Sequence, residues 1–153
     1  MALQVMSDAF AEDQQIPSIY TCDGRNISPP LRWSGVPAEA QTLALVVDDP
    51  DAPSGLFTHW LVYDLPPGAT GLPEGVPQQE TVDGGGRQGR NDFGRIGYGG
   101  PCPPSGSHRY VFTVYALDAP LDLPPGATRR QLFDAMDGHI IAEGRLIGRY
   151  QRG

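Results

Sequence analysis

Two of the three histidines stand at the start of strand-like segments, in surroundings that suit ligand binding. His59 is followed by Trp60, and His108 is followed by Arg109 and Tyr110. Each histidine lies where a hydrophobic run meets a loop rich in proline and glycine, so one end of a sheet could present both imidazoles. A protonated imidazole donates charge-assisted hydrogen bonds, which suits an oxyanion such as phosphate. The pattern therefore predicts an anion pocket between His59 and His108.

Two further segments offer partners for these histidines. Asp49 ends an apolar run, and we expect its carboxylate to orient one imidazole and raise the pKa of that imidazole. Gly100 has no side chain, so its backbone N–H could approach the anion closely. Asp51 lies in the same proline-rich turn as Asp49, where we interpret it as a turn-capping residue.

Each of these residues also has a purely structural explanation. A histidine at a strand edge is often packed and hydrogen-bonded without touching a ligand. The prolines around Gly100 could simply stiffen a bend, and Tyr110 could be a core residue whose hydroxyl is satisfied at the edge. His139, beside Gly138, is interpreted as structural or solvated.

The elements that must position these residues are mainly strands. Residues 42–47 form a continuous apolar run, typical of a central strand covered on both faces. Alternating or β-prone patterns predict further strands at residues 3–10, 31–33, 59–65, 109–117 and 140–150. One short helix is expected near 128–137, because Thr128 and Gln131 form a capping box and Gly138 ends the pattern.

Composition narrows the class of protein. At 153 residues the chain fits one domain, residues 1–153, and nothing indicates a cofactor. A net charge of −7 without a basic stripe argues against nucleic acid as a partner. All eleven basic residues are arginine, which excludes a Schiff-base lysine and a phosphate-loop lysine.

The hydropathy of the chain and its two cysteines indicate the cellular compartment of the protein. No run reaches the ~20 apolar residues of a membrane helix, and residues 1–10 lack a signal-peptide pattern. We therefore expect a cytoplasmic protein that does not span a membrane. Cys22 and Cys102 are too few and too far apart for a zinc site, and in a cytoplasm both should be reduced. Each lies beside a glycine- or proline-rich loop, so an oxidised pair stays open as the alternative.

Several short motifs occur in an order known from one protein family. They are residues 26–33, Asp49-Pro50-Asp51-Ala52-Pro53, His59-Trp60, residues 91–94 with 97–104, and His108-Arg109-Tyr110. The ordered set resembles the phosphatidylethanolamine-binding protein family, and more narrowly its bacterial and archaeal branch, often labelled Raf-kinase-inhibitor-like. The resemblance extends over nearly the whole chain, from the first strand to Tyr150.

The resemblance implies a mainly β fold class: two packed, largely antiparallel sheets with a small anion pocket at one sheet end. In the family this pocket holds phosphate, acetate, cacodylate or phosphoethanolamine-type groups. The family also implies a cis peptide bond between Ala52 and Pro53, and its bacterial members are often homodimers. Matched motif by motif, the ligand-binding residues of the family fall on Asp49, His59, Gly100, Pro101, His108 and Tyr110.

The chain departs from the eukaryotic members at its end. It stops soon after Tyr150 and lacks their C-terminal helix over the pocket. We expect a more open pocket, or one covered by the loop 84–97 or by a second subunit. The eukaryotic kinase-inhibitor and protease-inhibitor roles are accordingly in doubt here.

Two functions are open at this stage. The first is non-catalytic binding of a small anion or phospholipid headgroup, with a regulatory or inhibitor-like role and a phosphorylated protein as a further candidate partner. A zwitterionic headgroup suits the pocket better than bare phosphate, because Asp49 would repel an anion unless a proton or an ammonium group lies between them.

The alternative is a hydrolase of phosphate or acyl esters. Asp49, His59 and His108 would then act on the ester, with a nearby serine as nucleophile or a metal ion as a variant. The candidate serines lie in turn-like segments without the nucleophile-elbow pattern: Ser54, Ser105 and Ser107.

Overall fold

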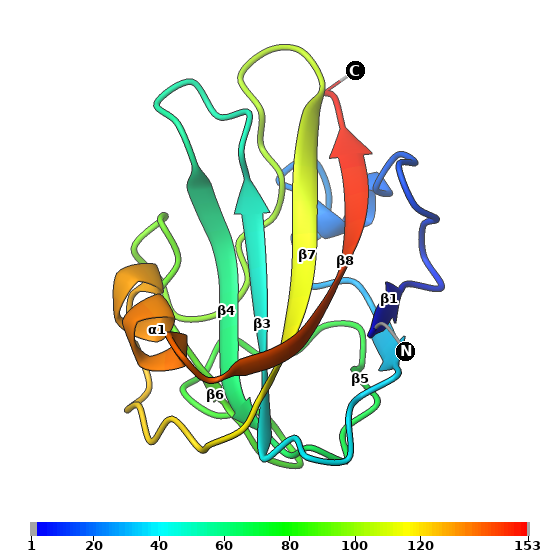
Figure 1. Ribbon diagram of the computed structural model, residues 1–153. Coiled ribbons are helices and arrows are strands. Elements are labelled where there is room, and N and C mark those ends of the chain that lie inside the picture. Colours follow the sequence, from blue (N-terminus) through cyan, green and yellow to red (C-terminus); the bar gives the residue numbers. More distant parts are fainter. Residues whose placement is uncertain (1–2, 153) are drawn as a thin grey trace.

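The computed structural model describes residues 3–152, which form two antiparallel sheets with an α-helix on the outer face of the larger one (Figure 1). The expected mainly β fold is therefore confirmed. The larger sheet has the strand order β6 (Arg87–Gln88), β4 (Phe57–Leu65), β3 (Thr42–Asp49), β7 (His108–Leu117) and β8 (Ile140–Tyr150). The smaller sheet has the order β1 (Gln4–Met6), β2 (Leu31–Ser34) and β5 (Gly71–Leu72), and a 3-10 turn (η1) covers Ser18–Tyr20.

Strand β3 is buried on both faces, as its apolar run predicted. Leu43, Leu45 and Val47 point into the core that the two sheets share. Ala44 and Val46 point to the opposite face, into a second cluster under the helix. Because side chains alternate along a strand, a strand covered on both sides needs apolar residues at consecutive positions.

Helix α1 (Arg129–Met136) begins where the capping box predicted. The Thr128 hydroxyl accepts from the Gln131 N–H at 3.2 Å, and the Gln131 side chain accepts from the Thr128 N–H at 2.9 Å. Leu132 and Met136 are fully buried against the outer face of the larger sheet. No helix within the described residues has the length and apolar character that crossing a membrane requires.

Three strand ends meet at one edge of the larger sheet. Strand β3 ends at Asp49, which is paired with Phe57 at the start of β4, and Asp48 is paired with Val111 near the start of β7. The antiparallel order therefore brings the C-terminal end of β3 beside the N-terminal ends of β4 and β7, at the top of Figure 1. The sequence predicted the anion pocket at this end of the sheet.

Candidate functional site

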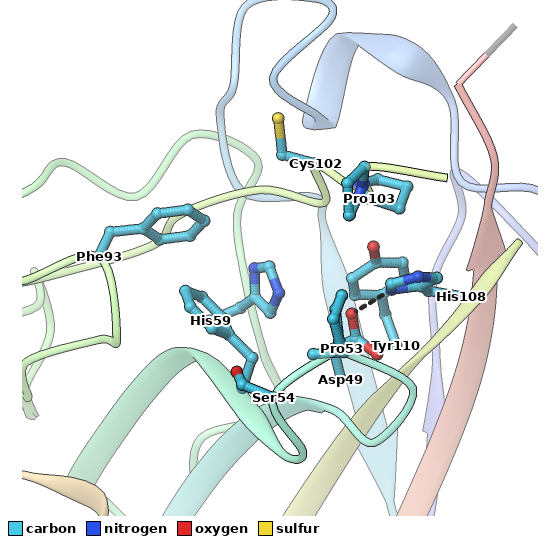
Figure 2. Close-up of a pocket in the computed structure, with 12 residues that line it drawn as sticks. Asp49, Pro53, Ser54, His59, Phe93, Cys102, Pro103, His108 and Tyr110 are labelled. Carbon is cyan, nitrogen blue, oxygen red and sulfur yellow. Dashed lines mark hydrogen bonds and ion pairs between the residues drawn. The ribbon is translucent and has the colours of Figure 1, made fainter. Parts of the chain in front are cut away.

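A cavity of about 280 Å³ opens at this sheet end (Figure 2). Among the residues expected to bind the ligand, Asp49, His59, His108 and Tyr110 line it. The structure thus brings together side chains from β3, β4 and β7 that are far apart in the sequence. Most of the remaining wall is apolar.

Asp49 holds His108 in place. The Nδ1 atom of His108 donates to Oδ2 of Asp49 at 2.7 Å, and both side chains are more than nine-tenths buried. The other carboxylate oxygen, Oδ1, accepts from the Asp51 N–H at 2.7 Å. Both oxygens of Asp49 are therefore engaged by the protein, and Nε2 of His108 has no protein partner among residues 3–152. The expected orientation of one histidine by Asp49 is present.

His59 is held by the backbone rather than by a carboxylate. Its Nδ1 atom donates to the carbonyl oxygen of Gly99 at 2.7 Å, because a carbonyl can only accept. This fixes the proton on Nδ1 in the neutral ring, so Nε2 carries a lone pair. Burial lowers the pKa of His59 and outweighs the Gly99 carbonyl and nearby aspartates, which act in the other direction. His59 thus offers the pocket an acceptor when neutral and a donor when protonated.

Tyr110 contributes an unused hydroxyl to the wall. The side chain is fully buried, and its hydroxyl oxygen has no hydrogen-bond partner among the described residues. Burial, followed by the charges of Asp49 and Asp51, raises the pKa of Tyr110, so the group stays a neutral donor. The ring lies edge-on to His59, with centroids 5.2 Å apart.

Gly100 and Pro101 build the loop rather than the wall of the cavity. The N–H of Gly100, which we expected to meet the anion, instead donates to Oδ1 of Asn26 at 2.8 Å. A Cβ at this position would collide with Asn26 and with the Tyr20 carbonyl, so glycine is needed for close packing of two loops. The carbonyl of Pro101 accepts from the Cys22 N–H at 3.1 Å.

The turn after β3 differs from the expectation in two respects. The peptide bond between Ala52 and Pro53 is trans, since the described chain has no cis peptide bond. The turn closes instead through Asp49 Oδ1 and a bond from the Gly55 N–H to the Ala52 carbonyl at 3.0 Å. Asp51 does more than cap the turn, because it accepts two hydrogen bonds from the Arg109 guanidinium, which hold the pKa of Asp51 down at about 2.

Phe93 and Phe57 complete the wall, and the sequence reasoning did not select them. Their ring centroids are 4.8 Å apart, and that of Phe93 lies 5.4 Å from that of His59. The Asn91 side chain accepts from the Phe93 N–H at 2.9 Å and from the Arg95 N–H at 3.2 Å, which fixes the loop that carries Phe93. This loop lies inside the segment 84–97 that was expected to cover the pocket, and its Asn-Asp-Phe-Gly motif was the available signal.

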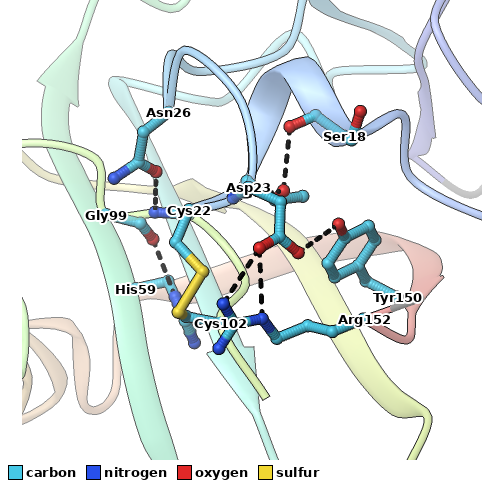
Figure 3. The surroundings of a disulfide bond; sticks show 11 residues. Ser18, Cys22, Asp23, Asn26, His59, Gly99, Cys102, Tyr150 and Arg152 are labelled. Carbon is cyan, nitrogen blue, oxygen red and sulfur yellow. Dashed lines mark hydrogen bonds and ion pairs between the residues drawn. A yellow bond between two sulfur atoms is a disulfide. The ribbon is translucent and has the colours of Figure 1, made fainter. Parts of the chain in front are cut away.

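The expectation of reduced cysteines is wrong. Cys22 and Cys102 form a disulfide across 80 residues of sequence, with their Cα atoms 5.4 Å apart (Figure 3). The two loops lie side by side because Gly100 admits a close approach and Pro101 bonds to Cys22. Cys102 is itself part of the cavity wall. Within residues 3–152, no group of three or more histidine, cysteine, aspartate or glutamate side chains could hold a metal ion.

Comparisons with known proteins agree with this fold. Residues 6–151 match the family model of phosphatidylethanolamine-binding proteins. The UPF0098 protein of the archaeon Methanothermobacter thermautotrophicus is 55% identical over 151 residues, which cover 99% of this chain and 100% of that protein.

Two crystal structures give the same result. A putative phosphatidylethanolamine-binding protein homologue from Chlamydia trachomatis superposes with a TM-score of 0.92 at 46% identity, covering 99% of both chains. An Escherichia coli protein described as a new member of the mammalian family superposes with a TM-score of 0.90 at 33% identity, covering 100% of both chains. Relatives therefore occur in archaea and in bacteria, and this chain belongs to the phosphatidylethanolamine-binding protein family.

Proposed function

We propose that the cavity binds a small oxyanion, a phosphate or a carboxylate, without catalysing a reaction. The observation that carries this proposal is Tyr110, a residue of the cavity wall whose buried hydroxyl has no hydrogen-bond partner within the described residues. A buried hydroxyl left without a hydrogen bond costs about 1–3 kcal/mol. An oxyanion that accepts from Tyr110 would recover this free energy on binding.

The charge of Asp49 does not oppose such a ligand as strongly as the sequence indicated. One carboxylate oxygen is bonded to His108 and the other to the backbone of Asp51. The ligand would therefore meet Nε2 of His108 rather than a free carboxylate.

His59 adds a condition on the ligand. Its neutral ring presents a lone pair on Nε2, which repels a fully deprotonated oxygen. The ligand must bring a hydrogen, as a protonated phosphate or an ammonium group does, or His59 must take up a proton. A phosphoethanolamine-type headgroup meets this condition.

The proposal is tested by calorimetric titration of phosphoethanolamine into the protein and a His108 variant. His108→Asn keeps a donor for Asp49, which alanine would not, and removes Nε2. We expect affinity to fall at least about tenfold, the value of one charge-assisted hydrogen bond. The matched control is His139→Asn, since His139 bonds to Asp118 at 2.8 Å in another, exposed histidine–aspartate pair. Equal affinity in the wild type and His108→Asn would end the assignment of the pocket.

A hydrolase is the second candidate, favoured by the Asp49–His108 pair and by Ser54, which lines the same cavity. Ser105 and Ser107 lie in the exposed turn before β7. Turnover of p-nitrophenyl acetate or p-nitrophenyl phosphate that is lost in His108→Asn would support it. Absence of turnover above the buffer rate in the wild type would remove this candidate.

We further propose that binding serves a regulatory role toward a headgroup or a phosphorylated protein, and that the protein forms a homodimer. Family membership supports a binding role in general. Light scattering coupled to gel filtration measures the mass in solution, and a mass of 16.4 kDa would contradict the dimer.

A further inference from the structure

A second hollow adjoins the anion cavity. It has a volume of about 150 Å³ and shares Phe93 and Cys102 with the larger cavity as a common boundary. The rest of its wall comes from the loop 91–100, from Gln78 and from the segment with Cys22 and Asn26, beside the disulfide. The two hollows therefore adjoin at Phe93 and Cys102, and a ligand that occupies both must cross this boundary.

Two carboxamides of the hollow have their orientation fixed by the backbone. Oδ1 of Asn26 accepts from the Gly100 N–H, which leaves Nδ2 as a donor without a partner among residues 3–152. Nε2 of Gln78 donates to the Tyr98 carbonyl at 2.7 Å, which leaves Oε1 as an acceptor. The Gly100 N–H can only donate, so it must face the oxygen of the Asn26 amide. The Tyr98 carbonyl can only accept, so it must face the nitrogen of the Gln78 amide, and exchanging oxygen and nitrogen in either side chain would break its bond.

Arg95 supplies a positive charge at the same place. Its backbone is held by Asn91, through the 3.2 Å bond to the side chain and a 2.8 Å bond from the Asn91 N–H to the Arg95 carbonyl. The Arg95 guanidinium has no ion pair with any described residue. By contrast, Arg109 pairs with Asp51 in the turn after β3, and Arg129 pairs with Asp48 near the end of β3. Arg95, an exposed residue, thus brings to the wall of the hollow a guanidinium without an ion pair among the described residues, in a chain of net charge −7.

We propose that this hollow is a second subsite, which holds a carboxylate carried by the same ligand whose phosphate occupies the anion cavity. Arg95 and Asn26 donate to the carboxylate, and Oε1 of Gln78 accepts from an ammonium group on the same carbon. The ligand is therefore a phosphate ester with an amino-acid end, the chemistry of O-phosphoserine. This inference rests on the proposed function, because it takes the phosphate to lie in the cavity.

The test compares ligands that differ only in the carboxylate. O-phosphoserine and phosphoethanolamine share the phosphate, the ammonium group and the carbon chain. By calorimetry the wild type should bind O-phosphoserine about fivefold more tightly or better, as one guanidinium and one amide donor allow. A chain of net charge −7 would favour the less negative ligand if only long-range charge acted, so this preference is diagnostic.

Arg95→Gln is the variant, and the ratio of the two affinities is the readout. The ratio should fall toward one in Arg95→Gln, because the carboxylate loses its guanidinium partner and keeps only the Asn26 donor. Arg130→Gln is the matched control, since Arg130 is an exposed arginine of α1 with no ion pair to a described residue, and the ratio should keep its wild-type value. A wild-type ratio of one, or a ratio unchanged in Arg95→Gln, overturns the second subsite.

The experiment also separates this inference from the proposed function. If phosphoethanolamine and inorganic phosphate do not bind the wild type at all, the proposed function fails and the inference falls with it. If both bind and the carboxylate adds nothing, the second subsite alone is wrong. Glycerophosphoserine and glycerophosphoethanolamine give the same comparison for a lipid headgroup. If their affinity ratio exceeds that of O-phosphoserine to phosphoethanolamine, the ligand is a lipid headgroup, and if it is smaller, the ligand is the free phosphate ester.

Discussion

Three residues decide what the pocket accepts, because each is buried and keeps one polar atom unused. Tyr110 offers a hydroxyl, and His59 and His108 each offer Nε2, since Nδ1 of His108 is bonded to Asp49. The unused atoms are the ones a ligand can engage. Binding should therefore respond to changes at Tyr110 and His59 in ways that packing alone would not produce.

Tyr110→Phe should affect affinity and stability in opposite directions. Removing a buried hydroxyl without a partner should leave the free energy of unfolding unchanged or raise it by up to about 1 kcal/mol. Removing the ligand's donor should weaken phosphate binding about fivefold to tenfold. Calorimetric titration and urea unfolding measure the two quantities.

Tyr63→Phe is the control for that pair of measurements. The Tyr63 hydroxyl is bonded to the Pro124 carbonyl and the Ala127 N–H, away from the cavity. This variant should lose about 1 kcal/mol or more of stability and keep its affinity. A Tyr110→Phe protein that loses stability as Tyr63→Phe does would show that the Tyr110 hydroxyl has a partner inside the fold.

Anion binding should strengthen as pH falls. Burial lowers the pKa of His59 in the free protein, and a bound oxyanion beside Nε2 favours the protonated ring and raises that pKa. The complex therefore takes up a proton, and affinity rises with acidity by at most about tenfold per pH unit. Sulfate is the suitable probe, because it does not titrate between about pH 5 and 8.

His59→Gln tests the source of this pH dependence. Glutamine can still donate to the Gly99 carbonyl, but it does not titrate. The slope of log affinity against pH should decrease in this variant. An unchanged slope would assign the proton uptake to another group.

The strand ends predicted that Asp49, His59 and His108 lie close together, because neighbours in an antiparallel sheet meet there, and the family resemblance added Tyr110 to this group. The sequence could not predict the role of the Gly100 N–H. That depends on Asn26, which is 74 residues away and approaches only when two loops pack. Short-range patterns carry no information on such pairs.

At the scale of the elements, the disulfide connects two loops beside the pocket. It joins the loop after η1 to the loop that carries Gly100 and Pro103, and Cys102 lies in the wall. The bond closes a loop of 80 residues, so it removes many conformations from the unfolded chain.

The double variant Cys22→Ser/Cys102→Ser should be less stable by about 2–4 kcal/mol. For a chain of this length that corresponds to a fall in Tm of roughly 10 °C. Calorimetric scans of the wild type with and without a strong reductant should show a fall of the same size. Equal Tm values for the oxidised and the reduced protein would contradict a stabilising disulfide.

The long strands, the helix and the short strands β1 and β2 were predicted, although β1 ends at Met6 and not at Phe10, whereas β5 and β6 were not predicted. Strands β3, β4, β7 and β8 have eight to eleven residues and show apolar runs or alternation, and α1 has a complete capping box. Strands β5 and β6 have two residues each and lie outside the ranges in which the sequence predicted strands. Two residues are too few to show a period.

At the scale of the whole molecule, an acidic protein can still hold an anion site. The net charge is −7, yet three aspartates at the end of β3 and the turn after it are paired. Asp48 pairs with Arg129 at 3.0 Å, Asp49 with His108 at 2.7 Å and Asp51 with Arg109 at 2.8 Å. The pocket is therefore less negative than the composition indicates.

The most direct test of an anion site is a crystal structure of the protein grown with a high concentration of phosphoethanolamine. The proposal predicts a phosphate group in the cavity, within hydrogen-bond distance of Nε2 of His59, Nε2 of His108 and the Tyr110 hydroxyl. A cavity without the ligand, or a phosphate bound elsewhere with these three atoms unpartnered, would contradict it.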